Sequence, residues 1–342
     1  MNVTLNVPSG LQASSSEEAA TSLHPSVPFA VRGEAPMALK LRHGGQAHVS
    51  VPYELAGAPG APLLIVAGGI SAGRHVLSSA EFPDAGWWQA QTASLDQRRY
   101  RILSFDWFGA DGLIDAPIDP ADQATVAVRL LTDLGLGKAA AFIGASYGGM
   151  VGMHLAADHP ERIGALLAIS SAARPHPYSS ACRALQRRAV ALGQSGGDAA
   201  AGVALARALA MLTYRTPEEF AERFAAEPDI ECGHVRVAAE AYLDAHGERH
   251  CRRMSATAYR RLSESIDLHR IDPSAIAVPL TLAGVDADAL VPAADVRALA
   301  EVVPGSRFHL IPSRYGHDAF LKEDGQVAAV ITEFLETLEC AQ

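Results

Sequence analysis

The feature that most constrains this 342-residue chain is a serine framed by glycines in residues 144–150, with the sequence GASYGGM. An apolar run at 139–143 precedes it, and a helix-like run at 150–158 follows it. A serine between a buried strand and a helix is typical of a sharp, crowded turn whose flanking residues must be small, as Gly144, Gly148 and Gly149 are. The pattern therefore predicts a serine hydroxyl exposed at a strand tip. An ordinary glycine-rich turn is the alternative.

Short apolar runs alternate with helical patterns on both sides of this serine. Continuous apolar runs predict buried strands at 62–67, 100–107, 139–143, 165–170, 278–283 and 307–311. An alternating run at 47–53 predicts an edge strand. Helices are expected at 120–136, where apolar residues recur at helical spacing, at 150–158 and at 325–338. Strands alternating with helices indicate a mostly parallel sheet flanked by helices.

The rhythm changes between residues 172 and 271, where no buried-strand run occurs. Alanine-, leucine- and charge-rich stretches there predict helices at 182–192, 198–212, 217–225 and 235–246. Asp198 suits the N-cap position of the second helix. We interpret 172–271 as a helical insertion in a domain formed by 35–171 and 272–342. Residues 1–34, rich in Ser, Glu and Pro, are expected to form a flexible leader.

Composition and charge exclude several classes of function. The formal net charge of −10 argues against nonspecific nucleic-acid binding. No apolar run reaches the roughly 18 residues of a membrane span, and the N-terminus lacks a signal-peptide pattern. The four cysteines lack metal-like spacing, and His154, Asp158 and His159 have no second cluster to complete a metal site. We expect a cytoplasmic protein without a metal, a membrane or a nucleic-acid partner.

A serine hydroxyl needs a base to become a nucleophile, and the base is usually a histidine oriented by a carboxylate. This chain offers a serine, an acid and a histidine in that order along the sequence. The acid and the histidine each lie in a loop after a predicted strand. His317 follows the predicted strand at 307–311 and is the expected base. Asp286 and Asp288 both follow the strand at 278–283, and Asp288 is the preferred acid.

Acyl transfer also needs preorganised N–H donors for the oxyanion. The backbone N–H of Tyr147 is one expected donor, and Ile70 in the turn after the strand at 62–67 is the other, with Ser71 as the alternative. A His154–Asp158 pair at i, i+4 resembles part of a different acyltransferase motif. Within a helix such a pair is usually at the surface, so we expect it to have no catalytic role.

Several motifs, taken together, resemble the homoserine O-acyltransferases of the α/β-hydrolase fold. They are GASYGGM at 144–150, DADALVP at 286–292, GHDAFL at 316–321, GWW at 86–88, AMLTYRT at 210–216, EFAERF at 219–224 and ALQRRA at 184–189. The resemblance runs from about residue 43 to 335. It implies an α/β-hydrolase fold with a mostly parallel central sheet and a helical lid.

The resemblance further implies a two-step reaction in which a serine takes an acyl group from acyl-CoA and passes it to the homoserine hydroxyl. By position, Ser146 is the nucleophile, Asp288 the acid and His317 the base. Arg215 would pair with the carboxylate of the amino acid, and Asp318 with its amine. The family also implies a homodimer and no permanently bound cofactor, with the acyl-CoA as co-substrate.

The residues at 69–76 and 106–112 depart from those of the acetyl-transferring members. The compact length and the sequences ISA at 70–72, SYGGM at 146–150 and HDAFLKE at 317–323 resemble the succinyl-transferring branch. A succinyl donor needs a further cation, for which Arg74 and Arg187 are candidates. The expected function is homoserine O-succinyltransferase, with succinyl-CoA as donor, in methionine biosynthesis. Open alternatives are an acetyl-CoA-dependent homoserine or serine O-acetyltransferase, a serine hydrolase, and a non-catalytic ligand-binding protein of the same fold.

Overall fold

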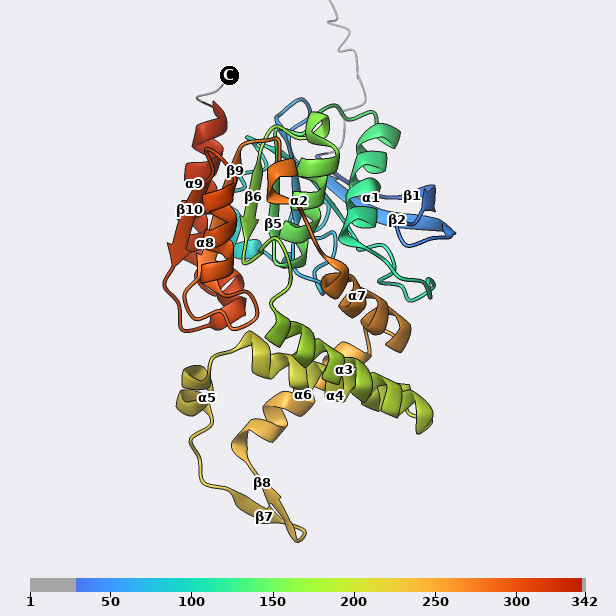
Figure 1. Cartoon of the computed structure of the whole chain (residues 1–342), viewed down its shortest axis with the longest axis vertical. Coiled ribbons are helices and arrows are strands. Elements are labelled where there is room, and N and C mark those ends of the chain that lie inside the picture. The colour runs from blue at the N-terminus through green and yellow to red at the C-terminus, as the bar shows by residue number, and fades with distance from the viewer. Residues whose placement is uncertain (1–28, 340–342) are drawn as a thin grey trace, which may run out of the picture.

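A computed structural model of the chain describes residues 29–339 and contains a central sheet of eight strands (Figure 1). The strands lie in the order β1-β2-β4-β3-β5-β6-β9-β10; only the pairs β1–β2 and β2–β4 are antiparallel. Their bounds are β1 Ala30–Lys40, β2 Gln46–Ala56, β3 Leu63–Ala67, β4 Arg101–Phe105, β5 Ala141–Ala145, β6 Leu166–Ile169, β9 Leu280–Val285 and β10 Arg307–Ile311. The predicted mostly parallel sheet is confirmed.

The central strands are apolar because helices or loops cover both faces of the sheet. β5, β6 and β9 are buried along their whole length. One apolar core lies between the sheet and the helices α1 Pro120–Asp133, α2 Tyr147–Asp158 and α8 Ala293–Val302. A second core lies on the other face, under helix α9 Asp324–Glu339 and the loop that carries Trp88 and Leu95. Because the strands from β4 to β10 in the sheet order are parallel, their carboxyl ends lie at one edge of the sheet, where the loops that follow them meet.

Two expectations at the start of the chain need correction. β1 begins at Ala30, so residues 30–34 belong to a strand and not to a leader; residues 1–28 lie outside the described part. β2 is not an edge strand, because β1 pairs along its whole length and leaves β2 between β1 and β4. The alternating residues of β1, with Ala35, Met37 and Leu39 buried, carry a strand signal that the polar leader composition masked.

Between β6 and β9 the chain forms five α-helices, a short hairpin and the 3-10 helix Pro273–Ala275. They are α3 Pro177–Ser195, α4 Ala199–Tyr214, α5 Pro217–Arg223, α6 Ala238–Cys251 and α7 Ala256–Leu268, with β7 Asp229–Glu231 and β8 His234–Arg236. The hairpin and the helices α7 and α8 were not predicted. The strands of the hairpin are exposed, so they form no buried apolar run. As predicted, Asp198 caps α4 by accepting from the Ala201 N–H. The limits of the insertion as a domain remain a prediction.

Helices α3, α4 and α6 lie together beside one end of the sheet (Figure 1). The hairpin of β7 and β8 extends farthest from the sheet. Helices α3 and α4 cross closely because glycines meet at the crossing: a Cβ on Gly193 would lie 2.6 Å from the Cα of Gly202. In residues 29–339, no helix is long and apolar enough to cross a bilayer.

Candidate active site

The turn between β5 and α2 holds Ser146 in a strained conformation, with φ 54° and ψ −117°. Backbone strain of this kind in a non-glycine residue persists only where the surroundings enforce it. A Cβ on Gly148 would lie 2.2 Å from the Ala67 carbonyl oxygen, and one on Gly144 would lie 2.4 Å from that of Gly148. The prediction that these positions must be small is therefore confirmed, since backbone atoms leave no room there.

Ser146, His317 and Asp288 form one hydrogen-bonded chain. The Ser146 Oγ lies 2.8 Å from His317 Nε2, and His317 Nδ1 lies 2.7 Å from Asp288 Oδ2. The other Asp288 oxygen accepts from the backbone N–H groups of Leu290 and Val291, at 2.8 and 2.9 Å. This order allows His317 to take a proton from the serine while the carboxylate fixes its tautomer.

The alternative acid, Asp286, lies elsewhere in the same loop. Its side chain is exposed and accepts from the Ser313 N–H at 2.9 Å. The Asp288 side chain, in contrast, is fully buried, and that of His317 is 7% exposed. The structure thus brings Asp288 and not Asp286 to the histidine.

Opposing effects set the pKa of His317. Burial alone would lower the pKa of the imidazole, but the adjoining Asp288 carboxylate outweighs burial, with a smaller contribution from Asp318, and the pKa is raised above its usual 6.5. A raised pKa makes the neutral ring a stronger proton acceptor. It also keeps more of the ring protonated near neutral pH.

The turn after β3 approaches Ser146 closely, since a Cβ on Gly69 would lie 3.9 Å from that of the serine. Trp107 holds this turn by donating its indole N–H to the Gly69 carbonyl at 3.0 Å. Within residues 29–339, neither the Tyr147 nor the Ile70 N–H donates to a backbone carbonyl. The two N–H groups therefore stay the predicted oxyanion donors, with Ser71 in the same turn as the alternative to Ile70.

Ser146 lies in the lining of two pockets. The first, here called the insertion pocket, is lined by Ser146, Met150 and Leu290 and by residues of the insertion such as Tyr259 and Ile266. The second, called the aspartate pocket, contains Ser146 with Trp87, Asp318, Phe320 and Leu321. Two neighbouring cavities therefore border the serine.

Arg215 and Asp318, expected to bind the amino acid, contact each other. Arg215 Nε lies 3.0 Å from Asp318 Oδ2, and its Nη1 lies 2.8 Å from Glu219 Oε1. Burial raises the pKa of Asp318. Burial alone would lower the pKa of Arg215, but Asp318, with Tyr242 and Glu219, outweighs burial, and the pKa is raised. Asp318 borders the aspartate pocket together with Ser146; Arg215 does not reach the lining of either pocket.

The two arginines expected to select the acyl group are both engaged elsewhere. Arg74 Nη1 contacts Asp106 Oδ2 at 2.6 Å, and Arg187 Nη1 contacts Asp267 Oδ2 at 2.7 Å. Neither side chain lines a pocket that contains Ser146. This corrects the expectation for Arg74 and Arg187, because proximity in sequence to the turn or to the insertion helix does not orient a guanidinium toward the serine.

Arg207 is the cation that the sequence reasoning missed. It lies on α4, half-buried, with its guanidinium carbon 5.1 Å from the centre of the Tyr214 ring. It lines both pockets that contain Ser146, and within the described residues no carboxylate lies within 4.0 Å of it. The available signal was its position as the single charge in the otherwise apolar helix 199–214.

His154 differs from its expected surface position. It is 1% exposed, its Nε2 lies 3.3 Å from His269 Nδ1, and its Nδ1 lies 3.6 Å from Asp158 Oδ2. The helix α2 turns this histidine into the core because the helix is apolar on nearly every face. Neither pocket that contains Ser146 includes His154, and residues 29–339 hold no group of three or more side chains placed to bind a metal.

Comparison with known proteins identifies what the chain resembles. A family model described as the α/β-hydrolase fold matches residues 62–324. A homoserine O-succinyltransferase from Xanthomonas campestris pv. campestris is 52% identical over 314 residues, covering 91% of this chain and 85% of that protein. A homoserine O-acetyltransferase from Thermus thermophilus is 34% identical over 287 residues, covering 74% and 73%. A serine O-succinyltransferase from Litchfieldella anticariensis is 28% identical, covering 88% and 97%.

Solved structures agree on the fold. A homoserine O-acetyltransferase from Bacillus anthracis superimposes with a TM-score of 0.81 at 15% identity, covering 90% of this chain and 98% of that one. Esterase E22 superimposes with a TM-score of 0.80 at 15% identity, covering 90% and 100%. The expected α/β-hydrolase fold is therefore confirmed. Because a transferase and an esterase both share it, the fold alone does not distinguish transfer from hydrolysis.

Proposed function

The chain belongs to the homoserine O-acyltransferases of the α/β-hydrolase fold, and we propose that it transfers the succinyl group of succinyl-CoA to the hydroxyl of homoserine. The observation that carries the proposal is the 52% identity, over nearly the whole chain, to a homoserine O-succinyltransferase. The hydrogen-bonded Ser146, His317 and Asp288 supply the machinery that such a transfer needs.

In the first half-reaction, Ser146 Oγ attacks the thioester carbonyl while His317 Nε2 takes the hydroxyl proton. The oxyanion that forms accepts from the N–H groups of Tyr147 and Ile70. The C–S bond then breaks, and the departing CoA thiolate takes the proton from His317. The enzyme is left with a succinyl ester on Ser146.

In the second half-reaction, the homoserine hydroxyl attacks the succinyl ester. His317 takes the hydroxyl proton and returns it to Ser146 Oγ as the ester bond to the enzyme breaks. Asp288 does not change protonation; its carboxylate holds the proton of His317 on Nδ1 and stabilises the imidazolium in both steps.

Asp318 and Arg215 would bind the zwitterionic end of homoserine. The ammonium group is attracted to Asp318, which borders the aspartate pocket, and the carboxylate to Arg215. Because these two side chains already form an ion pair, a zwitterion can replace the direct contact with one cation and one anion of its own. Glu219 would stay on Arg215 and keep its guanidinium oriented.

Arg207 would bind the free carboxylate of the succinyl group. It lines both pockets beside Ser146 and has no carboxylate partner among the described residues, so its charge is available to an anion. An acetyl group offers no such anion. Arg207 therefore replaces Arg74 and Arg187 as the candidate for donor selection.

The helices between β6 and β9 would cover the acyl-serine and exclude water, which separates transfer from hydrolysis. Acyl-CoA is then a co-substrate, and no permanently bound cofactor takes part in the reaction. A place in methionine biosynthesis, a cytoplasmic location and a homodimer accompany this proposal as predictions.

Intact-mass measurement with succinyl-CoA, with and without homoserine, tests the proposal. We expect a succinyl adduct on the wild-type protein that disappears when homoserine is added and that never forms in Ser146→Ala. Faster acylation by acetyl-CoA at equal concentration would favour the acetyltransferase instead. An adduct that is lost at the same rate without homoserine would indicate a hydrolase, and a discharge by serine in preference to homoserine would identify the other acceptor. A wild-type chain that no acyl-CoA acylates would indicate a ligand-binding protein.

A further inference from the structure

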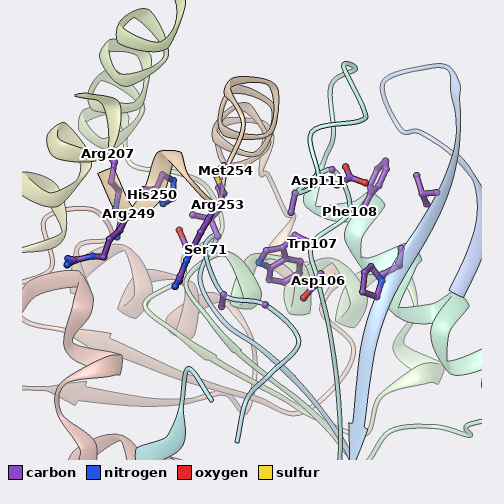
Figure 2. A pocket seen from close by; sticks show the side chains of 18 of the residues that line it. Ser71, Asp106, Trp107, Phe108, Asp111, Arg207, Arg249, His250, Arg253 and Met254 are labelled. Atoms are coloured by element: carbon purple, nitrogen blue, oxygen red, sulfur yellow. The ribbon is translucent and has the colours of Figure 1, made fainter. Parts of the chain in front are cut away.

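A third pocket lies next to the two that contain Ser146. This outer pocket, a cavity of about 510 Å³, lies between the end of α6 and the loops that follow β3 and β4. Figure 2 shows that its labelled arginines and His250 lie on one side, and Asp106 and Asp111 on the other. Apart from Arg207, the proposed reaction does not use these charged side chains.

Two arginines of the outer pocket have no carboxylate within ion-pair distance among residues 29–339. Arg249 on α6 and Arg253 just after it are exposed, and in the part of the chain that the structure describes no carboxylate lies within 4.0 Å of either. Their neighbour Arg252, which does not line the pocket, lies 3.8 Å from Glu248. Two unpaired cations facing a cavity are unexpected in a chain whose net charge is −10.

The side chains around these arginines are consistent with a positive potential. Burial lowers the pKa of His250 to about 4, with Arg207 and Arg253 contributing, and burial together with Arg249 and Arg207 lowers that of His246 to about 4. Across the pocket, Arg74 balances the charge of Asp106, while Asp111 accepts from the Leu113 N–H. Among the described residues, neither aspartate lies within 4.0 Å of Arg249 or Arg253.

The outer pocket is continuous with the catalytic serine. Ile70, Ser71 and Arg207 line it and also line both pockets that contain Ser146. A ligand can therefore have an anionic end at the outer pocket and a reactive end at the serine. Acyl-CoA has this form, because a pantetheine arm separates its thioester from a diphosphate and a 3′-phosphate.

We propose that Arg249 and Arg253 bind the phosphate groups of the acyl-CoA donor in the outer pocket. This inference rests on the proposed acyl-CoA reaction. Guanidinium groups suit phosphate oxygens because they donate in a fixed, often bidentate geometry. Homoserine and a succinyl group on Ser146 carry no phosphate, so the two arginines should affect the first half-reaction only.

The test compares two donors that share the thioester and differ in the phosphates: succinyl-CoA and succinyl-pantetheine. Arg249→Gln and Arg253→Gln should each lower kcat/KM for succinyl-CoA about tenfold, as expected for a charge-assisted contact. The values for succinyl-pantetheine and kcat/KM for homoserine should not change. Arg252→Gln is the matched control, since it removes a neighbouring charge that does not face the pocket.

Three results would overturn the inference: an unchanged kcat/KM for succinyl-CoA in the double variant, equal losses with both donors, or an equal loss in Arg252→Gln. Thermal unfolding of each variant separates an equal loss caused by misfolding from one caused by chemistry, and either origin rejects the phosphate contact. If the wild-type chain transfers succinyl from neither donor, the proposed function fails instead, which is a distinct result.

Discussion

Replacing Asp288 by asparagine should stop acylation of Ser146 while leaving the fold intact, because of the way in which this carboxylate is held. Two backbone N–H groups, of Leu290 and Val291, donate to its Oδ1, while Oδ2 faces His317 Nδ1 at 2.7 Å. In the variant the amide oxygen would stay with the two N–H donors. The amide NH₂ would then face the histidine.

An NH₂ group facing Nδ1 requires that nitrogen to be an acceptor, which places the ring proton on Nε2. A protonated Nε2 cannot take the proton of Ser146 Oγ, 2.8 Å away. Rotating the amide would instead leave two buried N–H groups without an acceptor, at about 1–3 kcal/mol each. We therefore expect the inactive tautomer to dominate and acylation to slow about 10,000-fold, or roughly 5.5 kcal/mol.

Single-turnover release of the CoA thiol measures this step, and intact mass follows the adduct on Ser146. Asp286→Asn is the control, because that side chain is exposed and bonded only to the Ser313 N–H; it should acylate at the wild-type rate. The reasoning fails if Asp288→Asn keeps more than about a tenth of the wild-type rate, or if Asp286→Asn loses as much.

Four further changes test other parts of the site and the core. Acylation needs His317 in its neutral form, and the pKa of His317 is raised above 6.5. The value of kcat/KM should therefore fall as the pH drops through this raised pKa. A pH profile whose acidic limb lies below pH 6.5 would contradict this. Arg207→Leu should lower kcat/KM for succinyl-CoA at least about tenfold more than for acetyl-CoA, and an equal loss would remove Arg207 from donor selection. Gly148→Ala should destabilise the fold by about 3 kcal/mol or more, because the new Cβ would overlap the Ala67 carbonyl oxygen. Gly137→Ala is the control: no atom lies within 4 Å of its Cβ position, so the melting temperature should stay nearly unchanged. Burial lowers the pKa of His269 to about 3, so below pH 6.5 the unfolded chain binds a proton that the folded chain does not. The free energy of unfolding, measured by urea denaturation, should therefore fall as the pH drops from 6.5 toward 3. It should fall less steeply in His269→Gln.

Much of the fold and the catalytic constellation could be predicted because the signals are local or depend on strand order. Backbone atoms around Gly144 and Gly148 leave no room for a side chain, so the sequence of the turn carries its geometry. The buried runs give the parallel strands, and parallel strands end at one edge of a sheet. That order alone predicts that the loops with Asp288 and His317 approach Ser146.

What the sequence left undecided concerns charges, because the partner of a charged side chain is chosen by packing in three dimensions and follows no period along the chain. Arg74 pairs with Asp106, Arg187 with Asp267 and Arg215 with Asp318, across separations that no local pattern reveals. Only the tertiary structure decided that Asp288 and not Asp286 meets the histidine. The tertiary structure also places Arg207 beside the serine and Arg249 and Arg253 at the outer pocket. Among the described residues, none of these three arginines has a carboxylate within 4.0 Å.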